Sequence, residues 1–527
     1  MKRRSQQGAQ ALTYLLLLLG IFLVVNLISN QIFGRIDLTE GKIYSLSKGS
    51  KELVRNLDDP LTVKAFFSEN LPPPYNSNAR YLRDQLDDYK AYGKGKFKYE
   101  FIDPASQENL EQEAQDFQIP PVQVNAVEKD RLEVKKVYMG LAFLYQDKHE
   151  SIPVMQSTAG LEYEISSTIK HLTSQQRQTV GIFQGLGAPD AMQAMNNLRS
   201  ILEKNYTVTN VDLARNQMVP DEVDALLVIG VTEDFDDWSR FAIDQFIMRG
   251  GNVAFLVNKV LADLQTQMAR KGPFTIDEWT KQYGFKINDD LALDFKCGMI
   301  NMQQRMGFFT ISNAVQYPFF PQVTEFNSYN PMVMDLENLM LFFPSTIDTT
   351  YAAEKNLSLT PLFFSTDHSK TQVNRFDIKP LEKINQEEFT GGPYVLAAAL
   401  EGEFTSFFQG KAVPAGDSQA PPRNIEIIPN SPLSRLVVVG DGHLAQDMYM
   451  GDPSNLAFLL NMVDWLAGEE DLIEIRTRDV TNRPIAEVSA GVKNTVKYAN
   501  MFAPPLILIV IGLVRWQIRR RRKNTEF

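Results

Sequence analysis

Apolar positions form two long runs, one near each end of the chain, with short periodic runs between them. The first long run covers residues 11–28, and the second covers residues 501–514, with tolerant positions from 496 onward. About 18 to 20 apolar residues, at 1.5 Å per residue, cover the ~30 Å core of a bilayer. The pattern therefore predicts one transmembrane helix within residues 1–32 and another over residues 496–518.

Basic residues flank both long runs on their terminal sides. Lys2, Arg3 and Arg4 precede the first run, and the basic tail 519–527 follows the second. Lys and Arg close to a membrane span stay in the cytoplasm, so both termini are expected there and the main body outside. A cleaved signal peptide is the alternative for the first run, but the run ends without a small-residue cleavage pattern. A buried core helix with a solvated tail is the alternative for the second.

The segment after the first run predicts a small α/β domain over residues 33–174. Alternation favours a strand at 61–67, helical spacing favours a helix at 78–92, and a second alternating run follows at 97–101. Strand, helix and strand at this spacing are typical of a right-handed βαβ unit. Further strands are expected near 122–127 and 137–145, followed by a helix at 162–172.

A larger α/β domain is predicted over residues 175–475, followed by a linker at 476–495. Buried strands alternate with amphipathic helices, a pattern typical of an open, mostly parallel sheet covered by helices. The predicted strands are 179–183, 225–229, 253–257 and 436–439, and the predicted helices are 191–204, one containing Trp238 to Ile247, and 455–466. Residues 275–420 have weak periodicity, and we interpret them as an insertion-rich continuation of the same sheet.

Net charge, cysteine count and histidine spacing argue against several classes of function. The chain has 527 residues, of which 44% are hydrophobic, and a net charge of -11. This charge argues against a nucleic-acid-binding body, which would carry a basic face. The lone Cys297 permits no internal disulfide, and the four histidines lack metal-ligand spacing. No metal site is predicted.

The first candidate binding site is a Gly-x-Gly turn that follows the strand at 179–183. Gln184, Gly185, Gly187 and Asp190 lie between that strand and the next predicted helix. Glycines let the backbone approach a ligand, and the helix directs its N-terminal N–H groups toward an anion. The third glycine of a dinucleotide fingerprint is replaced by Asp190, which suits a helix cap. A tight structural turn and an anion site are both open interpretations.

The second candidate is the pair Asp441 and His443, which follows the strand at 436–439. Open α/β sheets place their sites at the carboxyl ends of strands. A hydrolytic set would also need a nucleophile, and no Ser or Cys stands on a strand-to-helix elbow. The nearest approach to a P-loop, at residues 41–43, lacks both the first glycine and the hydroxyl residue that would hold magnesium. No catalytic residue is therefore assigned, and ATP hydrolysis by this chain is not expected.

Several motifs resemble those of the GldG family, auxiliary components of ABC transport systems first associated with gliding motility. The matches begin with Arg-Ile-Asp-Leu-Thr-Glu-Gly-Lys-Ile-Tyr-Ser-Leu-Ser directly after the first long run. The others, in chain order, are residues 63–67, 101–104, 250–251, 392–394 with 396–400, 438–441 and 461–468. Together they extend over nearly the whole chain.

The resemblance implies a bacterial inner-membrane protein whose periplasmic body works with a separate ATPase and a separate permease. It also implies that the larger domain is similar to class I glutamine-amidotransferase-like folds, a domain type shared with ciliary transport proteins. Family members often carry Gly-His-Gly-Glu after the first strand of that domain, where this chain has Gly185-Leu186-Gly187-Ala188. Loss of both polar positions favours a binding or scaffolding use of the fold.

The expectation is a non-catalytic auxiliary subunit of an ABC-type complex. Its partners would be an ABC ATPase, a multi-span permease, membrane lipid and an extracytoplasmic substrate or envelope component, with no nucleic acid and no cofactor. Its ligand contacts would be Gln184, Gly185, Gly187, Asp190, Asp441 and His443. The alternatives are a membrane-anchored envelope hydrolase that uses Asp441 and His443, and a structural envelope protein without an ATPase partner.

Overall fold

The computed structural model describes residues 45–476 with short gaps, together with residues 511–517 and scattered positions of the two terminal segments. The gaps are 74, 129–130, 156, 159, 175–176, 307–308, 335, 381–383, 417–424, 471 and 474. The chain divides into two units, Met1–Thr481 and Asn482–Phe527. Of the predicted transmembrane segments, the structure describes residues 17, 20 and 21 in the first and residues 497, 500–502, 505, 509 and 511–517 in the second, so neither is described over its full length. Within the part that is described, no helix is both long and apolar enough to cross a membrane.

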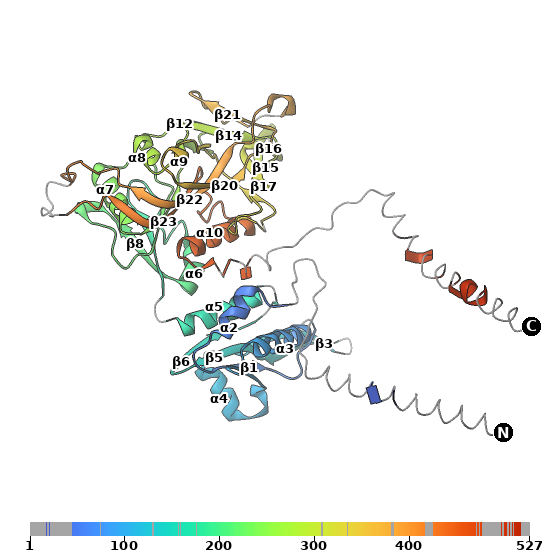
Figure 1. Ribbon diagram of the computed structural model, residues 1–527. Helices are drawn as coiled ribbons and strands as arrows, with labels where there is room; N and C mark the ends of the chain where they lie inside the picture. Colours follow the sequence, from blue (N-terminus) through green and yellow to red (C-terminus); the bar gives the residue numbers. More distant parts are fainter. Residues whose placement is uncertain are drawn as a thin grey trace, which may run out of the picture. The chain divides into compact units, whose positions relative to one another are not determined.

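A four-stranded sheet forms the centre of the N-terminal part, in the order β2-β1-β5-β6 (Figure 1). Its strands are β1 Leu61–Phe67, β2 Phe97–Ile102, β5 Met139–Tyr145 and β6 Lys148–Ile152. β1 and β2 are parallel, whereas β5 is antiparallel to both β1 and β6. The predicted β-strand, helix and parallel β-strand are therefore confirmed as elements.

Helices cover both faces of this sheet because side chains alternate along β1. One face packs against α2, α3 and α5, while the other, with Phe66 and Ala142, packs against α4. The helices are α2 Lys48–Arg55, α3 Tyr75–Tyr92, α4 Glu108–Asp116 and α5 Leu161–Thr173, with the turn η1 Pro104–Ser106. β3 Val122–Glu128 and β4 Arg131–Val137 form a separate antiparallel hairpin.

An eight-stranded sheet forms the centre of the larger part, in the order β17-β20-β22-β23-β10-β9-β7-β8. The strands are β7 Thr179–Gln184, β8 Thr207–Asp212, β9 Ala225–Ile229, β10 Asn252–Leu256, β17 Glu325–Phe326, β20 Ser358–Phe364, β22 Val395–Thr405 and β23 Asn430–Val439. The five strands from β23 to β8 are mutually parallel. The remaining three are antiparallel, so the sheet is mixed rather than parallel throughout.

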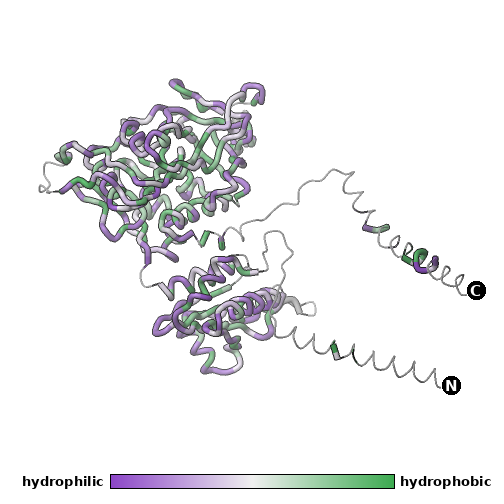
Figure 2. Tube along the Cα trace, viewed as in Figure 1, coloured by the Kyte–Doolittle hydropathy of each residue, from purple (hydrophilic) through white to green (hydrophobic). Residues whose placement is uncertain are grey.

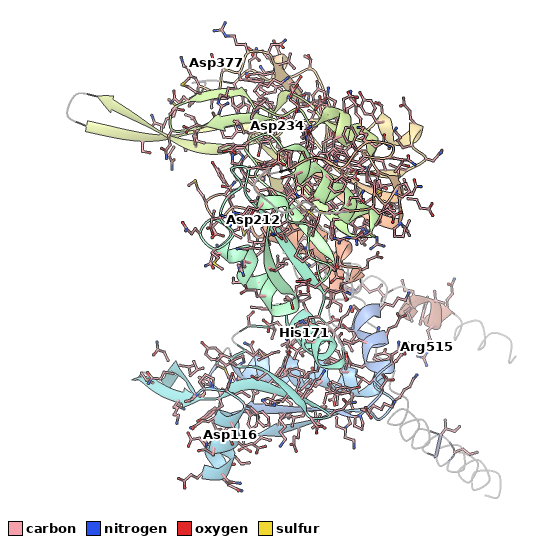
Figure 3. All side chains as sticks on the ribbon, turned by 90° about the vertical axis from the view of Figure 1, so that its left-hand side faces the viewer. Asp116, His171, Asp212, Asp234, Asp377 and Arg515 are labelled. Carbon is pink, nitrogen blue, oxygen red and sulfur yellow. The ribbon has the colours of Figure 1, made fainter. Side chains whose placement is uncertain are left out.

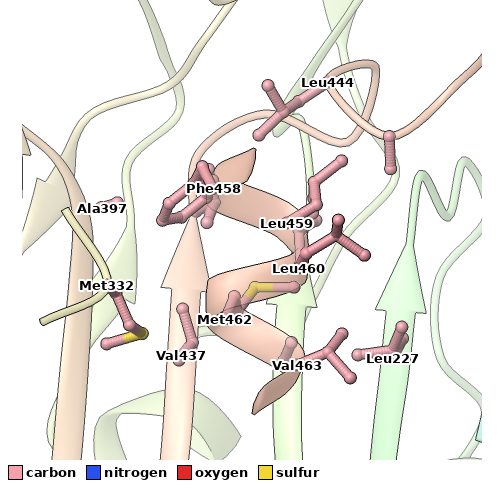
Figure 4. Packing of buried hydrophobic residues seen from close by; sticks show 14 of the residues in the cluster. Leu227, Met332, Ala397, Val437, Leu444, Phe458, Leu459, Leu460, Met462 and Val463 are labelled. Carbon is pink, nitrogen blue, oxygen red and sulfur yellow. The ribbon is translucent and has the colours of Figure 1, made fainter. Parts of the chain in front are cut away.

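Helices also cover both faces of the large sheet. α6 Asn196–Asn205 and α10 Pro453–Leu466 pack on one face, and α7 Asp237–Met248 and α8 Asp277–Gln282 pack on the other. Figure 4 shows α10 directing Leu459, Met462 and Val463 toward the strands that carry Val437 and Leu227. Full burial of each such side chain stabilises the fold by about 1.5–3 kcal/mol. Figure 2 shows green, hydrophobic segments inside the larger part.

Residues 275–420 only partly continue the large sheet, which corrects the prediction for this region. β17, β20 and β22 join the sheet, whereas the other strands form separate small sheets. Those strands are β13 Lys286–Ile287, β14 Asp290–Asp294, β15 Cys297–Met306, β16 Phe309–Val323, β18 Leu339–Met340, β19 Ile347–Asp348 and β21 Ser369–Val373. The hairpin of β11 Val260–Asp263 and β12 Met268–Lys271 precedes this region. The remaining short elements are η2 Ala214–Asn216, α9 Tyr351–Glu354 and η3 Gln386–Glu388.

Candidate functional site

The predicted ligand-contact residues all lie on the carboxyl side of the large sheet. Gln184 ends β7, and Asp441 follows β23 within two residues. β9 and β10 lie between these two strands. Three strand spacings of about 4.8 Å separate β7 from β23 by roughly 14 Å. The two candidate groups therefore share one edge of the sheet but do not converge on a single small-ligand position.

The Gly-x-Gly turn holds the segment after β9. Gly185, Leu186 and Gly187 have φ values of 110°, 51° and 71°, in the left-handed region that favours glycine. The Leu186 carbonyl accepts hydrogen bonds from the amides of Thr232 and Glu233 at 3.1 and 3.0 Å. A Cβ at Gly187 would collide with the Thr232 hydroxyl, so these glycines serve the packing of two loops.

Gln184 and Asp190 also make local contacts. The Gln184 Nε2 donates to the carbonyl of Phe183 at 2.9 Å. The Asp190 Oδ1 accepts from the amides of Met192 and Gln193 at 2.7 and 3.2 Å. These amides belong to a turn that precedes α6. Asp190 therefore caps the turn, and the prediction that it caps the following helix is wrong.

The cap of α6 comes from Asp447, which follows β23. Its Oδ2 and Oδ1 accept from the amides of Asn196 and Asn197 at 2.9 and 3.0 Å, and its own amide donates to Ala194. A helix N-terminus attracts anions through these free N–H groups. The chain's own carboxylate thus occupies the position where the Gly-x-Gly turn and helix would bind a ligand anion.

Replacement of Asp447 by alanine is expected to lower the free energy of unfolding by about 1 kcal/mol, the usual cost of losing an N-cap. Hydrogen exchange at the first turn of α6 should increase, because Asn196 and Asn197 lose their acceptor. Asp190→Ala is the matched control, since its bonds remain within residues 190–193. Equal exchange in α6 for both variants would contradict this role for Asp447.

Asp441 is fully buried and binds together three segments. Its Oδ2 accepts from the amide of Phe342 at 2.7 Å, and its Oδ1 accepts from the amide of His443 at 2.8 Å and from Asn258 Nδ2 at 3.3 Å. Every one of these donors belongs to the protein itself. Hydrogen bonds to a buried charged group are strong, so Asp441 fixes the loop after β23 to the segment before Phe343.

His443 lies beside Asp441 in the arrangement of an Asp-oriented histidine. Its Nδ1 lies 3.3 Å from Asp441 Oδ1 and 3.2 Å from the Phe342 carbonyl. Two acceptors at Nδ1 favour the tautomer protonated there. The ring packs edge-on against Tyr449, with centroids 5.0 Å apart, and burial raises the pKa of the Tyr449 phenol. Among the described residues, the polar partners of the His443 ring nitrogens are Asp441 and the Phe342 carbonyl, with no hydroxyl or thiol hydrogen-bonded to them.

Cys297 does not supply a nucleophile to this edge. It begins β15 and pairs with Pro321 in the separate β15–β16 sheet. Burial raises the pKa of its thiol to about 11, so the thiolate that would attack a substrate is scarce near neutral pH. Among the residues that the structure describes, no group of three or more His, Cys, Asp or Glu side chains is arranged to hold a metal.

Two further polar residues at the same edge, Asn258 and Lys259, were not among the predicted site residues. Asn258 and Lys259 follow β10 after one intervening residue, Val257. Asn258 Oδ1 accepts from the Gly442 amide at 2.7 Å. The Lys259 side chain is 1% exposed, and its Nζ lies 2.7 Å from Asp277 Oδ1 and 3.4 Å from Asp289 Oδ1. The rule that singled out Asp441, a polar residue just past a buried strand, also applies to both.

A cavity of about 480 Å³ opens beside this edge of the sheet. Residues 213–215 after β8, residues 236–238 at the start of α7, and residues 414–416 line it. Arg215 contributes a cation and has a left-handed φ of 55°, while the Asp236 carboxylate is engaged with Ser239. The volume falls within the range of about 300–1,000 Å³ that ligand pockets usually occupy.

The fold and site define an α/β protein whose strand-end loops are tied together by internal polar contacts. A family model described as an ABC-type uncharacterized transport system matches residues 177–473, more than half of the chain and all of the large sheet. The chain belongs to this family. A second family model, for a domain of unknown function, matches residues 40–144.

Two further comparisons extend the description. An uncharacterized protein of Borreliella burgdorferi is 23% identical over 527 residues, covering 96% of this chain and 97% of the relative. Among solved structures, the mmIFT52 N-terminal domain aligns at 12% identity with a TM-score of 0.33, covering 55% of this chain and 97% of that domain.

Proposed function

We propose that this chain is a non-catalytic auxiliary subunit of an ABC-type transporter complex. The observation that carries the proposal is the family match over residues 177–473. The chain would work with a separate ATPase and a separate multi-span permease, because its sequence contains no P-loop. The motif resemblance to the GldG family, from residues 35–47 to 461–468, supports the same role.

In this proposal the two terminal apolar runs anchor the chain in a bacterial inner membrane and dock on the permease. Basic clusters outside both runs support cytoplasmic termini and a periplasmic body. The body would bind an extracytoplasmic substrate or an envelope component, and the cavity beside β8 and α7 supports such a contact. Changes in the permease driven by ATP would then alter the pose of the body.

The second candidate is a membrane-anchored hydrolase of envelope material. It rests on one observation, the 3.3 Å contact between Asp441 and His443. The buried Asp441 carboxylate is occupied by protein donors, and no nucleophile contacts His443 among the described residues. The auxiliary-subunit proposal needs no such group and is the better supported of the two.

Affinity purification of the tagged protein from native membranes in mild detergent tests the proposal. We expect an ABC ATPase and a multi-span permease to be recovered in amounts comparable to the chain. Reconstituted with the chain, their ATP turnover should differ from that of the two partners alone. Recovery of the chain alone across several gentle detergents, or ATP turnover indifferent to its presence, would count against the proposal.

A further inference from the structure

A buried polar cluster surrounds Arg476, the last described residue before the segment 477–496. The Arg476 side chain is 7% exposed, and that of Asp464 is fully buried. The guanidinium Nη2 lies 2.7 Å from Asp464 Oδ2, and Nη1 donates to Asn461 Oδ1 at 2.8 Å. Both partners belong to α10. The point where the chain leaves the large part is thus fixed to α10.

The same guanidinium also reaches α5 of the N-terminal part. Its Nη2 donates to the hydroxyl of Tyr163 at 2.6 Å, and its central carbon lies 4.5 Å from the centre of the Tyr163 ring. Asn205, the last residue of α6, donates to the same hydroxyl, and Tyr206 donates to Asp464 Oδ1 at 2.6 Å. One cation therefore joins α5, α10 and the end of α6; we call these six residues the Arg476 cluster.

Removal of one charged member of the Arg476 cluster is expected to lower the free energy of unfolding strongly. Burial raises the pKa of Asp464, and the nearby Arg476 opposes that change. Removal of one partner from a buried ion pair leaves an uncompensated charge in a low-dielectric interior, whereas removal of both charges is often tolerated. The cluster is therefore expected to be either complete or strongly destabilised.

Next to the cluster, the seam between α5 and the large sheet is polar. Lys170 pairs with Glu469, and the His171 Nε2 lies 3.2 Å from the carbonyl of Asn205; Figure 3 marks His171 at this seam. A small cavity of about 30 Å³ lies between these residues, enough for one or two waters. This polar seam adjoins the buried ion pair of the Arg476 cluster.

We propose that Arg476 couples the C-terminal segment of the chain to the seam between α5 and the large sheet. Displacement of residues 477–496 would pull the guanidinium against both Tyr163 and Asp464, and so change how the two sheets are held together. This inference rests on the proposed function, in which the following segment docks on the permease. The permease state would then be transmitted to the body through one buried side chain.

Hydrogen exchange on the full-length chain tests the coupling without any partner. Arg476→Met should increase exchange in α5 and in the end of α10 on the order of a hundredfold, because the buried Asp464 carboxylate loses its cation. The double variant with Asp464→Asn should recover most of that protection.

Arg435→Met is the matched control. Arg435 stacks 4.8 Å from the Trp465 ring and pairs with Glu470 near the end of α10, and it has no contact to α5 among the described residues. Unchanged exchange in α5 for Arg476→Met, or additive effects in the double variant, would overturn the coupling.

The reconstituted complex provides the second measurement. Addition of ATP should change exchange in α5 with the native chain, and Arg476→Met should abolish this response while assembly and basal ATP turnover stay the same. A response that persists in Arg476→Met would overturn the coupling even where the auxiliary role holds. Failure to recover an ATPase would overturn the proposed function instead, and the exchange of the isolated chain would still decide the role of Arg476.

Discussion

Replacement of Asp441 by asparagine is expected to lower the free energy of unfolding by about 3 kcal/mol. The side chain is fully buried, and its oxygens accept from the amides of Phe342 and His443 and from Asn258. Hydrogen bonds to a charged group contribute about 1.5–3 kcal/mol each. An amide group would retain one acceptor and direct an N–H toward a donor. Urea denaturation followed by tryptophan fluorescence measures the loss.

The matched control is His443→Gln, which should cost under about 1 kcal/mol because only one ring nitrogen has a polar partner in the described contacts. The same two variants separate the auxiliary-subunit and hydrolase proposals. If Asp441 has a structural role, Asp441→Asn lowers the free energy of unfolding much more than His443→Gln does. A hydrolase would instead lose activity in both variants, and His443→Gln would lose it while fully folded.

The elements that sequence periodicity predicted well are those set by local side-chain patterns. β1, β9 and α10 lie within two residues of their predicted bounds, because each buries a face that the sequence marks with apolar residues. The start of α6 was placed five residues too early. Its cap comes from Asp447, 251 residues further along the chain from Asn196, a distance at which local capping signals carry no information.

Long-range pairing also explains the errors in residues 275–420. β14 pairs with β21, and β13 pairs with β19, across long stretches of chain that contain other strands. Residues next to β13 or β14 in the sequence therefore do not indicate which strand lies beside it. β22 joins the large sheet antiparallel to β23, and β20 is in turn antiparallel to β22. Direction is a property of the connection rather than of the strand, which is why the antiparallel strands of this mostly parallel sheet could not be predicted.

The candidate site shows the same limit. Polar residues at strand ends could be predicted from the sequence, and Asp441 and His443 were found in this way. Whether such a group faces a ligand or another loop depends on distant partners. The Asp441 carboxylate faces another loop because the amide of Phe342, 99 residues away, donates to one of its oxygens. Asn258 donates to the other oxygen. The carboxyl edge of the sheet could thus be predicted from the sequence, but the protein groups that contact Asp441 there could not.

Lys259, which lies three residues after β10, forms a second group of polar contacts at the same edge of the sheet. A buried ammonium is stable only with compensating charge, and Asp277 and Asp289 provide it at 2.7 and 3.4 Å. Lys271 and Lys286 share the same carboxylates from more exposed positions. The group is a small alternating network in which Lys259 is the one member that water does not reach.

Lys259→Met is therefore expected to destabilise the protein by about 2–3 kcal/mol at neutral pH, less than the loss of a fully buried pair because both carboxylates are partly exposed. Lys271→Met is the control and should cost under about 1 kcal/mol, since the Lys271 side chain is 59% exposed. Denaturant unfolding of both variants measures the difference.

The cost of Lys259→Met should also shrink in acid. Burial would raise the pKa of Asp277, but Lys259 and Lys286 outweigh it and hold this pKa below its ordinary value of about 3.9. A carboxyl whose pKa is lowered by folding stabilises the protein above about pH 4 and loses that contribution as the pH falls through the folded value. Without Lys259 the lowering is weaker, so the native protein and the variant should converge in stability below about pH 4. A difference that stays constant from neutral pH to pH 3 would show that Lys259 acts through packing of its aliphatic stem and not through its charge.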